Sequence, residues 1–374
     1  MPWHEVSAVD LREEFVMLAR AEGANVRELC RRYGISPTTG YKWLARQGRG
    51  EALSDRSRRP HSSPMRTAAG IEARILDLRE RHPTWGARKL RRRLEDIGLT
   101  GLPGTSTVNA ILARHGRLDP AESAKHKAFI RFEHAAPNEL WQMDFKGHFA
   151  LAQGRCHPLT VIDDHSRFAI GLRACANEQW TTVQAQLTSL FERYGLPRRI
   201  LADNGPPWGD DADTPHTRLT VWLLHLDVPL DHGRPYHPQT QGKVERFHRS
   251  LLEDVVARET FTDLTHCQRR FDAWRRVYNT ERPHQAIDLQ VPLRRYQPSP
   301  RRLPQHLPPV EYDSTEIVRT VDCNGRISFK GRTCPVGKAF QGYRVALRST
   351  DKDGRFDICF KHYLIASLDL SEAT

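Results

Sequence analysis

The chain lacks several features that would define whole classes of protein. No run of eighteen or more apolar residues occurs among its 374 positions, which argues against a membrane-spanning helix and a membrane partner. Residues 1–10 lack the basic and then apolar stretches of a secretory signal, so we expect a cytoplasmic protein. The seven cysteines form no C-x-x-C pair and show no Cys/His ligand spacing, which argues against a disulfide framework and structural zinc.

Acidic residues are outnumbered by basic ones. The net charge is +12 and the pI is near 9.6. Residues 1–134 contain 25 Lys and Arg against 16 Asp and Glu, so nine of the excess charges lie in the first third of the chain. This asymmetry suggests a polyanionic partner such as nucleic acid, although a solvated basic face would give the same count. The length and the 39% hydrophobic content allow two to four domains with packed cores.

Residues 9–46 have the pattern of a helix-turn-helix. One short helix ends at Gly34, and the next begins after Ser36, which is predicted to cap it, with Tyr41 and Leu44 predicted to face inward. In a DNA-binding helix-turn-helix the second helix enters the major groove, whereas an ordinary helical hairpin is the alternative. The residues that we expect this helix to turn outward toward DNA are Thr38, Thr39, Lys42 and Arg46.

A second helical unit follows a linker rich in Gly, Ser, Arg and Pro at residues 48–64. Three apolar stripes between Thr67 and Leu112 predict three helices. The middle helix holds more cations than a core can accept, so we expect a further DNA contact, with a solvated charge run as the alternative. The DNA-binding candidates of this helix are Arg88, Lys89 and Arg92.

Three acidic residues lie in settings that predict a common site. Asp144 lies in a strand pattern, Asp203 follows a strand at a turn, and Glu245 lies in an amphipathic helix. Any one of them alone would more often be a solvated or capping residue. Together they predict a cation site, because clustered carboxylates repel one another and Mg²⁺ or Mn²⁺ prefers oxygen ligands. The neighbouring Asp163 and Asp164 instead resemble a strand-end turn.

The order of elements predicts the fold. Three hairpin strands between Leu140 and Ala174, followed by alternating helix and strand, are typical of an RNase H-like core. Residues 292–309 are rich in Pro and Arg and are predicted to be an extended, flexible spacer. Five short strands between residues 316 and 365 then predict a small β-barrel or sandwich. The other expected core elements are helices at 181–194, 219–226 and 264–278, a strand at 228–231, the strand before Asp203 and the Glu245 helix.

Four stretches carry a resemblance to a known family. WQMDFK, LADNG, YHPQTQGKVERFHRSL and YNTERPHQAI stand in the order found in insertion-sequence transposases of the DDE integrase superfamily, of the IS481 and IS3 type. The resemblance implies a core shared with retroviral integrases, although their zinc-binding HHCC module is absent. It implies that the catalytic residues Asp144, Asp203 and Glu245 bind two Mg²⁺ or Mn²⁺ ions. The interval of 42 positions from Asp203 to Glu245 is longer than usual, and we place the excess in residues 209–217.

The resemblance also implies a function and an organisation. The protein would bind the terminal inverted repeats of its element and carry out DNA cleavage and strand transfer, as an oligomer assembled on element ends and target DNA at the bacterial nucleoid. The expected domains are two all-α helix-turn-helix units, an α/β RNase H-like core with a mixed five-stranded sheet, and an all-β domain behind the spacer. Their expected bounds are 1–60, 61–136, 137–298 and 299–374. Further DNA-positioning candidates are Asn204, His237, Gln241, Lys243, Arg246 and Arg249.

Several alternatives stay open. A non-catalytic DNA-binding regulator could keep the fold without the reaction, although three negative charges would disfavour phosphate binding. A generic RNase H-like nuclease would not need two DNA-reading units. Lys243 and Arg246 could instead be surface cations, paired with Glu253 or solvent. The C-terminal domain could bind DNA, multimerise or contact another protein.

Overall fold

The computed structural model describes residues 7–57, 66–118, 133–209, 216–232 and 242–370. The chain divides into two compact units, Met1–Arg66 and Thr67–Thr374, and each is described by itself. The second unit contains three groups of elements that the sequence predicts as separate domains, so the boundaries between those domains stay predictions. No helix in the described ranges is long and apolar enough to cross a membrane.

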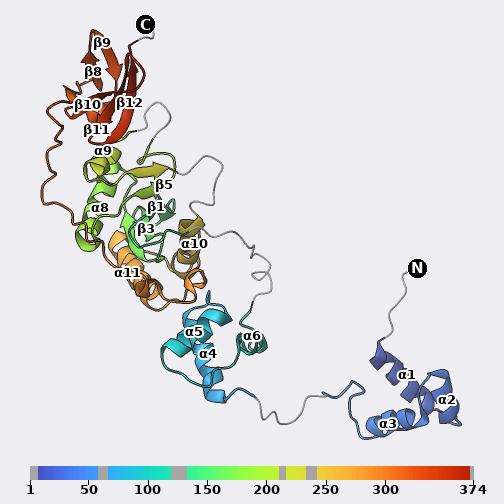
Figure 1. Ribbon diagram of the computed structural model, residues 1–374. Helices are drawn as coiled ribbons and strands as arrows, with labels where there is room; N and C mark the ends of the chain where they lie inside the picture. The colour runs from blue at the N-terminus through green and yellow to red at the C-terminus, as the bar shows by residue number, and fades with distance from the viewer. Residues whose placement is uncertain (1–6, 58–65, 119–132, 210–215, 233–241, 371–374) are drawn as a thin grey trace. The chain divides into compact units, whose positions relative to one another are not determined.

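The first unit is a bundle of three helices (Figure 1). Its helices are α1 (Ala8–Ala19), α2 (Val26–Arg32) and α3 (Pro37–Gly48). The Ser36 side chain caps α3 as predicted, by accepting a hydrogen bond from the Thr39 backbone N–H. The prediction that Tyr41 faces inward is wrong, because Trp43 fills the core and leaves the Tyr41 side chain 53% exposed.

The second unit begins with the three further helices that the sequence predicts. They are α4 (Ala69–Arg81), α5 (Ala87–Asp96) and α6 (Thr105–Arg114). Their apolar faces meet around Trp85, Leu90 and Ile111, which are buried. Arg93 of α5 forms an ion pair of 2.7 Å with Glu281, which directly follows the last helix of the core.

A mixed sheet forms the centre of the second unit. Its strands are β1 (Trp141–Phe145), β2 (Phe149–Ala150), β3 (Arg155–Asp163), β4 (Ala169–Cys175), β5 (Ile200–Ala202) and β6 (Leu230–His232). The order is β2-β3-β1-β5-β6, and β4 pairs with β3. The first hairpin strands pair antiparallel, whereas β1, β5 and β6 run parallel. The expected RNase H-like order is confirmed, with the two-residue β2 added to five strands.

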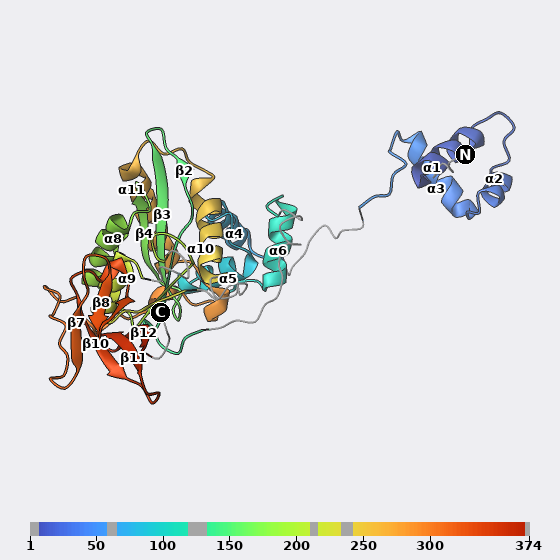
Figure 2. The same cartoon turned by 90° about the horizontal axis from the view of Figure 1, so that it is seen from above.

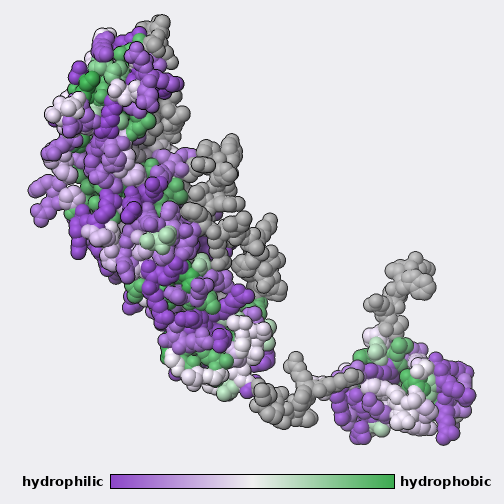
Figure 3. Space-filling model, viewed as in Figure 1, coloured by the Kyte–Doolittle hydropathy of each residue, from purple (hydrophilic) through white to green (hydrophobic). Residues whose placement is uncertain are grey.

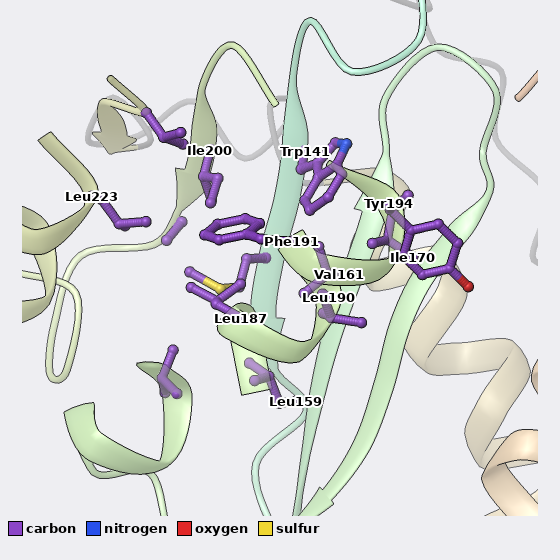
Figure 4. Close-up of a cluster of buried hydrophobic side chains, with 14 of the residues drawn as sticks. Trp141, Leu159, Val161, Ile170, Leu187, Leu190, Phe191, Tyr194, Ile200 and Leu223 are labelled. Carbon is purple, nitrogen blue, oxygen red and sulfur yellow. The ribbon is translucent and has the colours of Figure 1, made fainter. Parts of the chain in front are cut away.

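Helices cover both faces of this sheet (Figures 1 and 2). They are α8 (Trp180–Tyr194), α9 (Arg218–His225), α10 (Gly242–Leu251) and α11 (Leu264–Thr280). On one face, Leu187 and Phe191 of α8 pack on Trp141 and Val161 of the sheet (Figure 4). On the other face, α10 and α11 bury a second apolar cluster. A π-helical turn, Leu252–Val256, continues α10.

Residues 292–309 lie on the core and are not a free spacer. The Tyr296 ring stacks on Phe168 with centroids 4.2 Å apart, and the Ser299 N–H donates to the Tyr194 carbonyl at 2.8 Å. The Arg301 guanidinium donates to the carbonyls of Pro197, Leu226 and Asp227. The segment begins with the 3-10 helix Pro292–Arg294, so the prediction of an extended spacer holds only after it. The predicted flexibility is wrong, because side-chain packing and hydrogen bonds hold the segment in place.

The C-terminal domain is all-β, as predicted. Its strands are β7 (Ile317–Thr320), β8 (Arg326–Phe329), β9 (Arg332–Pro335), β10 (Arg344–Ser349), β11 (Arg355–Phe360) and β12 (Tyr363–Asp369). Four of them form the sheet β12-β11-β10-β7, and β8 pairs with β9, a strand that the sequence pattern did not predict. The viewed surface is mostly hydrophilic with small apolar areas (Figure 3).

Candidate active site

Asp144 and Asp203 lie at the same level of two neighbouring strands. The parallel strands β1 and β5 pair Trp141 with Ile200 and Gln142 with Leu201. Continuing this register by two residues places Asp144 of β1 beside Asp203, which directly follows β5. Glu245 lies in the first turn of α10, which packs against β1 and β3. The fold therefore places Asp144 beside Asp203, and it places Glu245 on the helix that packs against the strand of Asp144.

The acids affect one another electrostatically. Burial and the nearby negative charge of Asp203 raise the pKa of Asp144 to about 7, with smaller contributions from Glu178 and Glu245. Burial also raises the pKa of Asp203, against the lowering effect of a hydrogen bond from the Trp208 side chain. Carboxyl groups that are costly to ionise next to one another are those that a bound cation stabilises.

The carboxylates fit a hard divalent cation. Among the described residues, none of the three acids has an ion pair with Lys or Arg; the nearest basic partner of Asp144 is His248, with Nδ1 3.8 Å from Oδ2. Within the same ranges, no three His, Cys, Asp or Glu side chains lie close enough to hold one ion together. Mg²⁺ does not require three, because it is usually bound by one or two carboxylates, waters and substrate phosphate oxygens.

Two residues that the sequence argument missed support Asp144. His248 lies three positions after Glu245 on α10, and its Nε2 is 2.8 Å from the Thr160 hydroxyl. That hydroxyl donates to the backbone carbonyl of Asp144 at 2.9 Å, so the neutral imidazole is the donor to Thr160. Burial lowers the pKa of His248 to about 3, which keeps the ring uncharged. The i, i+3 spacing of Glu245 and His248 was the available sequence signal.

A fourth carboxylate, Glu178, also lies near the site. It precedes α8, its Oε1 is 2.8 Å from His157 Nδ1, and its charge raises the pKa of both Asp144 and Asp203. No motif in the sequence marked it, because it belongs to neither the strand pattern nor the Glu245 helix.

The predicted DNA-positioning residues of the core have different surroundings. Asn204, which follows Asp203, is exposed, and so are Arg246 and Arg249 on the Glu245 helix. Lys243 forms an ion pair with the buried Asp164, so its charge is directed into the protein. His237 and Gln241 lie outside the described residues.

One of the four residues predicted to face DNA from the first helix-turn-helix is buried instead. Thr38 and Lys42 are exposed on α3, and the Thr39 hydroxyl shares a hydrogen bond with Ser36. Arg46 is only 6% exposed, because its guanidinium donates to the carbonyls of Ala52 and Ser54. The prediction that Arg46 faces outward is therefore wrong.

The cations of α5 are mostly engaged within the protein. Arg88 is exposed, whereas Arg92 forms an ion pair of 3.0 Å with Asp96. Lys89 is partly buried, and burial together with the charge of Arg282 lowers its pKa to about 7. Of the three predicted residues, only Arg88 is exposed.

Five family models match different parts of the chain. Residues 134–238 and 226–292 match the integrase core domain, and residues 316–374 match the C-terminal domain of IS481 family transposases. Residues 39–112 match a homeodomain-like domain and residues 11–61 a helix-turn-helix domain, in agreement with the helical units described above.

Two of the curated relatives are proteins of insertion elements. The chain is 29% identical over 158 residues to an uncharacterized 31.7 kDa protein of insertion element IS407 from Burkholderia multivorans, covering 42% of this chain and 54% of the relative. It is 24% identical over 227 residues to an uncharacterized 39.2 kDa protein of insertion element IS476 from Xanthomonas euvesicatoria, covering 59% and 63%. The chain thus spans less than two thirds of either relative. A simian T-cell lymphotropic virus intasome in complex with PP2A regulatory subunit B56 gamma contains a chain that is 14% identical, with a TM-score of 0.39 and coverage of 79% and 96%. In its integrase core and its IS481-type C-terminal domain, the chain thus resembles the DDE-type insertion-sequence transposases.

Proposed function

We propose that this protein binds the terminal inverted repeats of a mobile element and catalyses metal-dependent cleavage and strand transfer of their DNA. The observation that supports this most directly is the grouping of Asp144, Asp203 and Glu245 at one edge of the core, with the pKa of Asp144 raised to about 7. A site made for binding phosphate alone would be better served by neutral or basic side chains.

The proposed roles follow from the chemistry of the side chains. Asp144, Asp203 and Glu245 would hold Mg²⁺ or Mn²⁺, two ions in our proposal, which activate a water or 3′-hydroxyl and stabilise the leaving oxygen of the phosphodiester. The hydroxyl of Thr160 and the neutral ring of His248 would keep Asp144 in place. The exposed side chains proposed to orient DNA are Asn204, Arg246 and Arg249.

The test is to replace each acid by its neutral near-isostere. Asp144→Asn, Asp203→Asn and Glu245→Gln should each abolish cleavage and joining of labelled element ends, because each removes ligand charge without changing side-chain volume. End binding measured in a chelator should stay close to that of the unchanged protein. Asp231→Asn is the matched control, because the Asp231 carboxylate pairs with Arg199 and is not one of the proposed ligands. If one of the three variants still cuts DNA at the unchanged rate, the residue replaced in it is not a metal ligand.

We also propose that at least two copies act together on DNA in the cytoplasm. Joining two ends to one target requires two sets of catalytic acids, and one chain supplies one set. The test mixes Glu245→Gln with a variant that carries Thr38→Glu and Lys42→Glu, two exposed positions of α3. Each should be inactive alone, and the mixture should regain joining. If both variants fold and associate but no mixture joins DNA, catalysis does not cross between copies.

One observation favours a second function, a DNA-binding regulator without catalysis. Within the described residues the acids are not gathered tightly enough for three of them to share one ion. Metal dependence separates the two functions. A transposase needs Mg²⁺ or Mn²⁺ for strand transfer, whereas a regulator shifts element-end DNA equally well in a chelator and cuts nothing.

A further inference from the structure

Two adjacent acids at the end of β3 have different surroundings. The Asp163 carboxylate accepts hydrogen bonds from the Ser166 N–H and the Ser166 hydroxyl within its own turn, and one from the Asn138 N–H. Asp164 is also buried, but its partners come from elsewhere in the chain. The strand-end turn predicted for the pair therefore describes Asp163, and Asp164 requires another explanation.

The Asp164 carboxylate joins three separate segments of the core. Its Oδ1 accepts a hydrogen bond from Gln142 Nε2 at 2.8 Å and forms an ion pair with the Lys243 ammonium group. Its Oδ2 accepts from the His134 backbone N–H at 2.9 Å, in the segment that enters the core. The Lys243 side chain is only 18% exposed, so the ion pair is largely shielded from solvent.

Two partners of Asp164, Gln142 and Lys243, each lie two positions before a proposed metal ligand. Gln142 lies two residues before Asp144 on β1, and side chains two apart on a strand point to the same face. Lys243 lies two residues before Glu245 in the first turn of α10, where two positions correspond to a rotation of about 200°. Holding Lys243 against the core therefore fixes the rotation of the first turn of α10, and with it the direction of Glu245.

The pairing constrains geometry because a buried charge cannot be left without a partner. Separating Lys243 from Asp164 would leave a nearly dry carboxylate with its hydrogen-bond donors and the nearby charge of Arg167, but without its direct ion pair. The first turn of α10 is therefore held at a fixed depth and rotation against β1. An apolar pair of the same volume could give similar stability, but it would not set the rotation of the helix by a directed contact.

We propose that Asp164 is a positioning residue of the active site, which sets Asp144 through Gln142 and Glu245 through Lys243. The inference rests on the proposed metal-dependent function. Partners that orient metal ligands without touching the metal usually change metal affinity by about 10- to 100-fold when they are removed. Asp164 would act in this way on two ligands at once.

The experiment uses the full chain with Mn²⁺ as the probe, followed by the rise in melting temperature on titration and by electron paramagnetic resonance of the free ion. Asp164→Asn and Lys243→Met should each weaken Mn²⁺ binding by about tenfold or more, and Lys243→Arg should restore most of it. Cleavage of element ends should fall at limiting Mg²⁺ and recover at high Mg²⁺. The matched control is Lys361→Met, which breaks an ion pair of 2.6 Å with Asp227 near the C-terminal domain. It should change the melting temperature and leave Mn²⁺ affinity unchanged.

The outcomes distinguish failure of the positioning role of Asp164 from failure of the proposed metal-dependent function. If the unchanged protein neither binds Mn²⁺ nor cuts DNA, the proposed function fails. If it does both and the folded Asp164 and Lys243 variants match it, Asp164 has only a structural role. Should the single variants fail to fold, the double variant Asp164→Leu with Lys243→Met removes both charges and leaves neither unpaired. Weak Mn²⁺ binding by the folded double variant supports the inference, whereas normal binding overturns it.

Discussion

Replacing Tyr296 by alanine should destabilise the second unit by about 3–5 kcal/mol, the usual cost of truncating a buried aromatic residue. Tyr296 is 7% exposed and lies flat on Phe168, at an interplanar angle of 6°. Its hydroxyl donates to Asn138 Oδ1 at 3.2 Å, and the same oxygen accepts a hydrogen bond from Trp141 Nε1. Tyr296→Phe should therefore cost only about 1 kcal/mol, because Asn138 keeps a partner and the stacked ring remains.

The assay is urea unfolding of the full chain, followed by tryptophan fluorescence, because Trp141 lies in the same cluster as Tyr296. The control is Leu293→Ala in the same segment, where the side chain is 50% exposed and truncation should cost less than about 1 kcal/mol. If Tyr296→Ala and Leu293→Ala have equal unfolding midpoints and slopes, residues 292–309 are a loose tether and the packing argument is wrong.

Three further predictions concern the helical units. Gly40→Ala should lower the melting temperature of the first unit and reduce its free energy of unfolding by about 1–3 kcal/mol, because the new Cβ would lie 2.5 Å from Cys30 Sγ. An unchanged melting temperature would show that the neighbouring side chains move aside without cost. Burial lowers the pKa of Lys89 to about 7, below its unfolded value, so stability should rise as the pH increases from 7 toward 10. Lys89→Met should remove that rise and stabilise the protein by about 1–2 kcal/mol at pH 7. The measurement is urea unfolding at pH 7 and pH 9, and a variant that is less stable than the unchanged protein at both would contradict the prediction. Lys42→Ala should weaken DNA binding and reduce the slope of log affinity against log salt concentration by about 1, without changing stability. Arg46→Ala should instead lower the melting temperature, because Arg46 is buried. If salt-dependent binding and melting assays give the opposite pattern, the orientation of α3 is wrong.

Much of the core could be predicted from the sequence, because its elements have clear periods. The helix expected at 181–194 is α8, Trp180–Tyr194, since its apolar residues recur at helical spacing up to Gly195. The proximity of Asp144 and Asp203 could be expected because each follows or ends a hydrophobic strand. Their register could not, because it depends on β1 and β5 pairing in parallel.

Side-chain orientation and long-range partners were harder to predict. On α3 both Tyr41 and Trp43 are aromatic, and the choice of Trp43 for the core depends on how α1 and α2 pack against it. Arg46 binds carbonyls that follow the helix, and Lys243 binds an acid 79 positions earlier in the chain. Composition alone treats such cations as available for DNA. Only the fold shows which of them already have partners within the protein.

Helix α9 limits how the C-terminal domain can be exchanged between related proteins. Leu219 and Leu223 of this helix belong to the core cluster, whereas Val221 and Leu224 belong to the apolar cluster of the β domain. Its last residue, His225, lies 2.6 Å from the Pro308 carbonyl through Nε2. A β domain transplanted from a relative would meet a helix face shaped for another partner, so recombination at this junction should succeed only when the α9 sequence is inherited together with the domain.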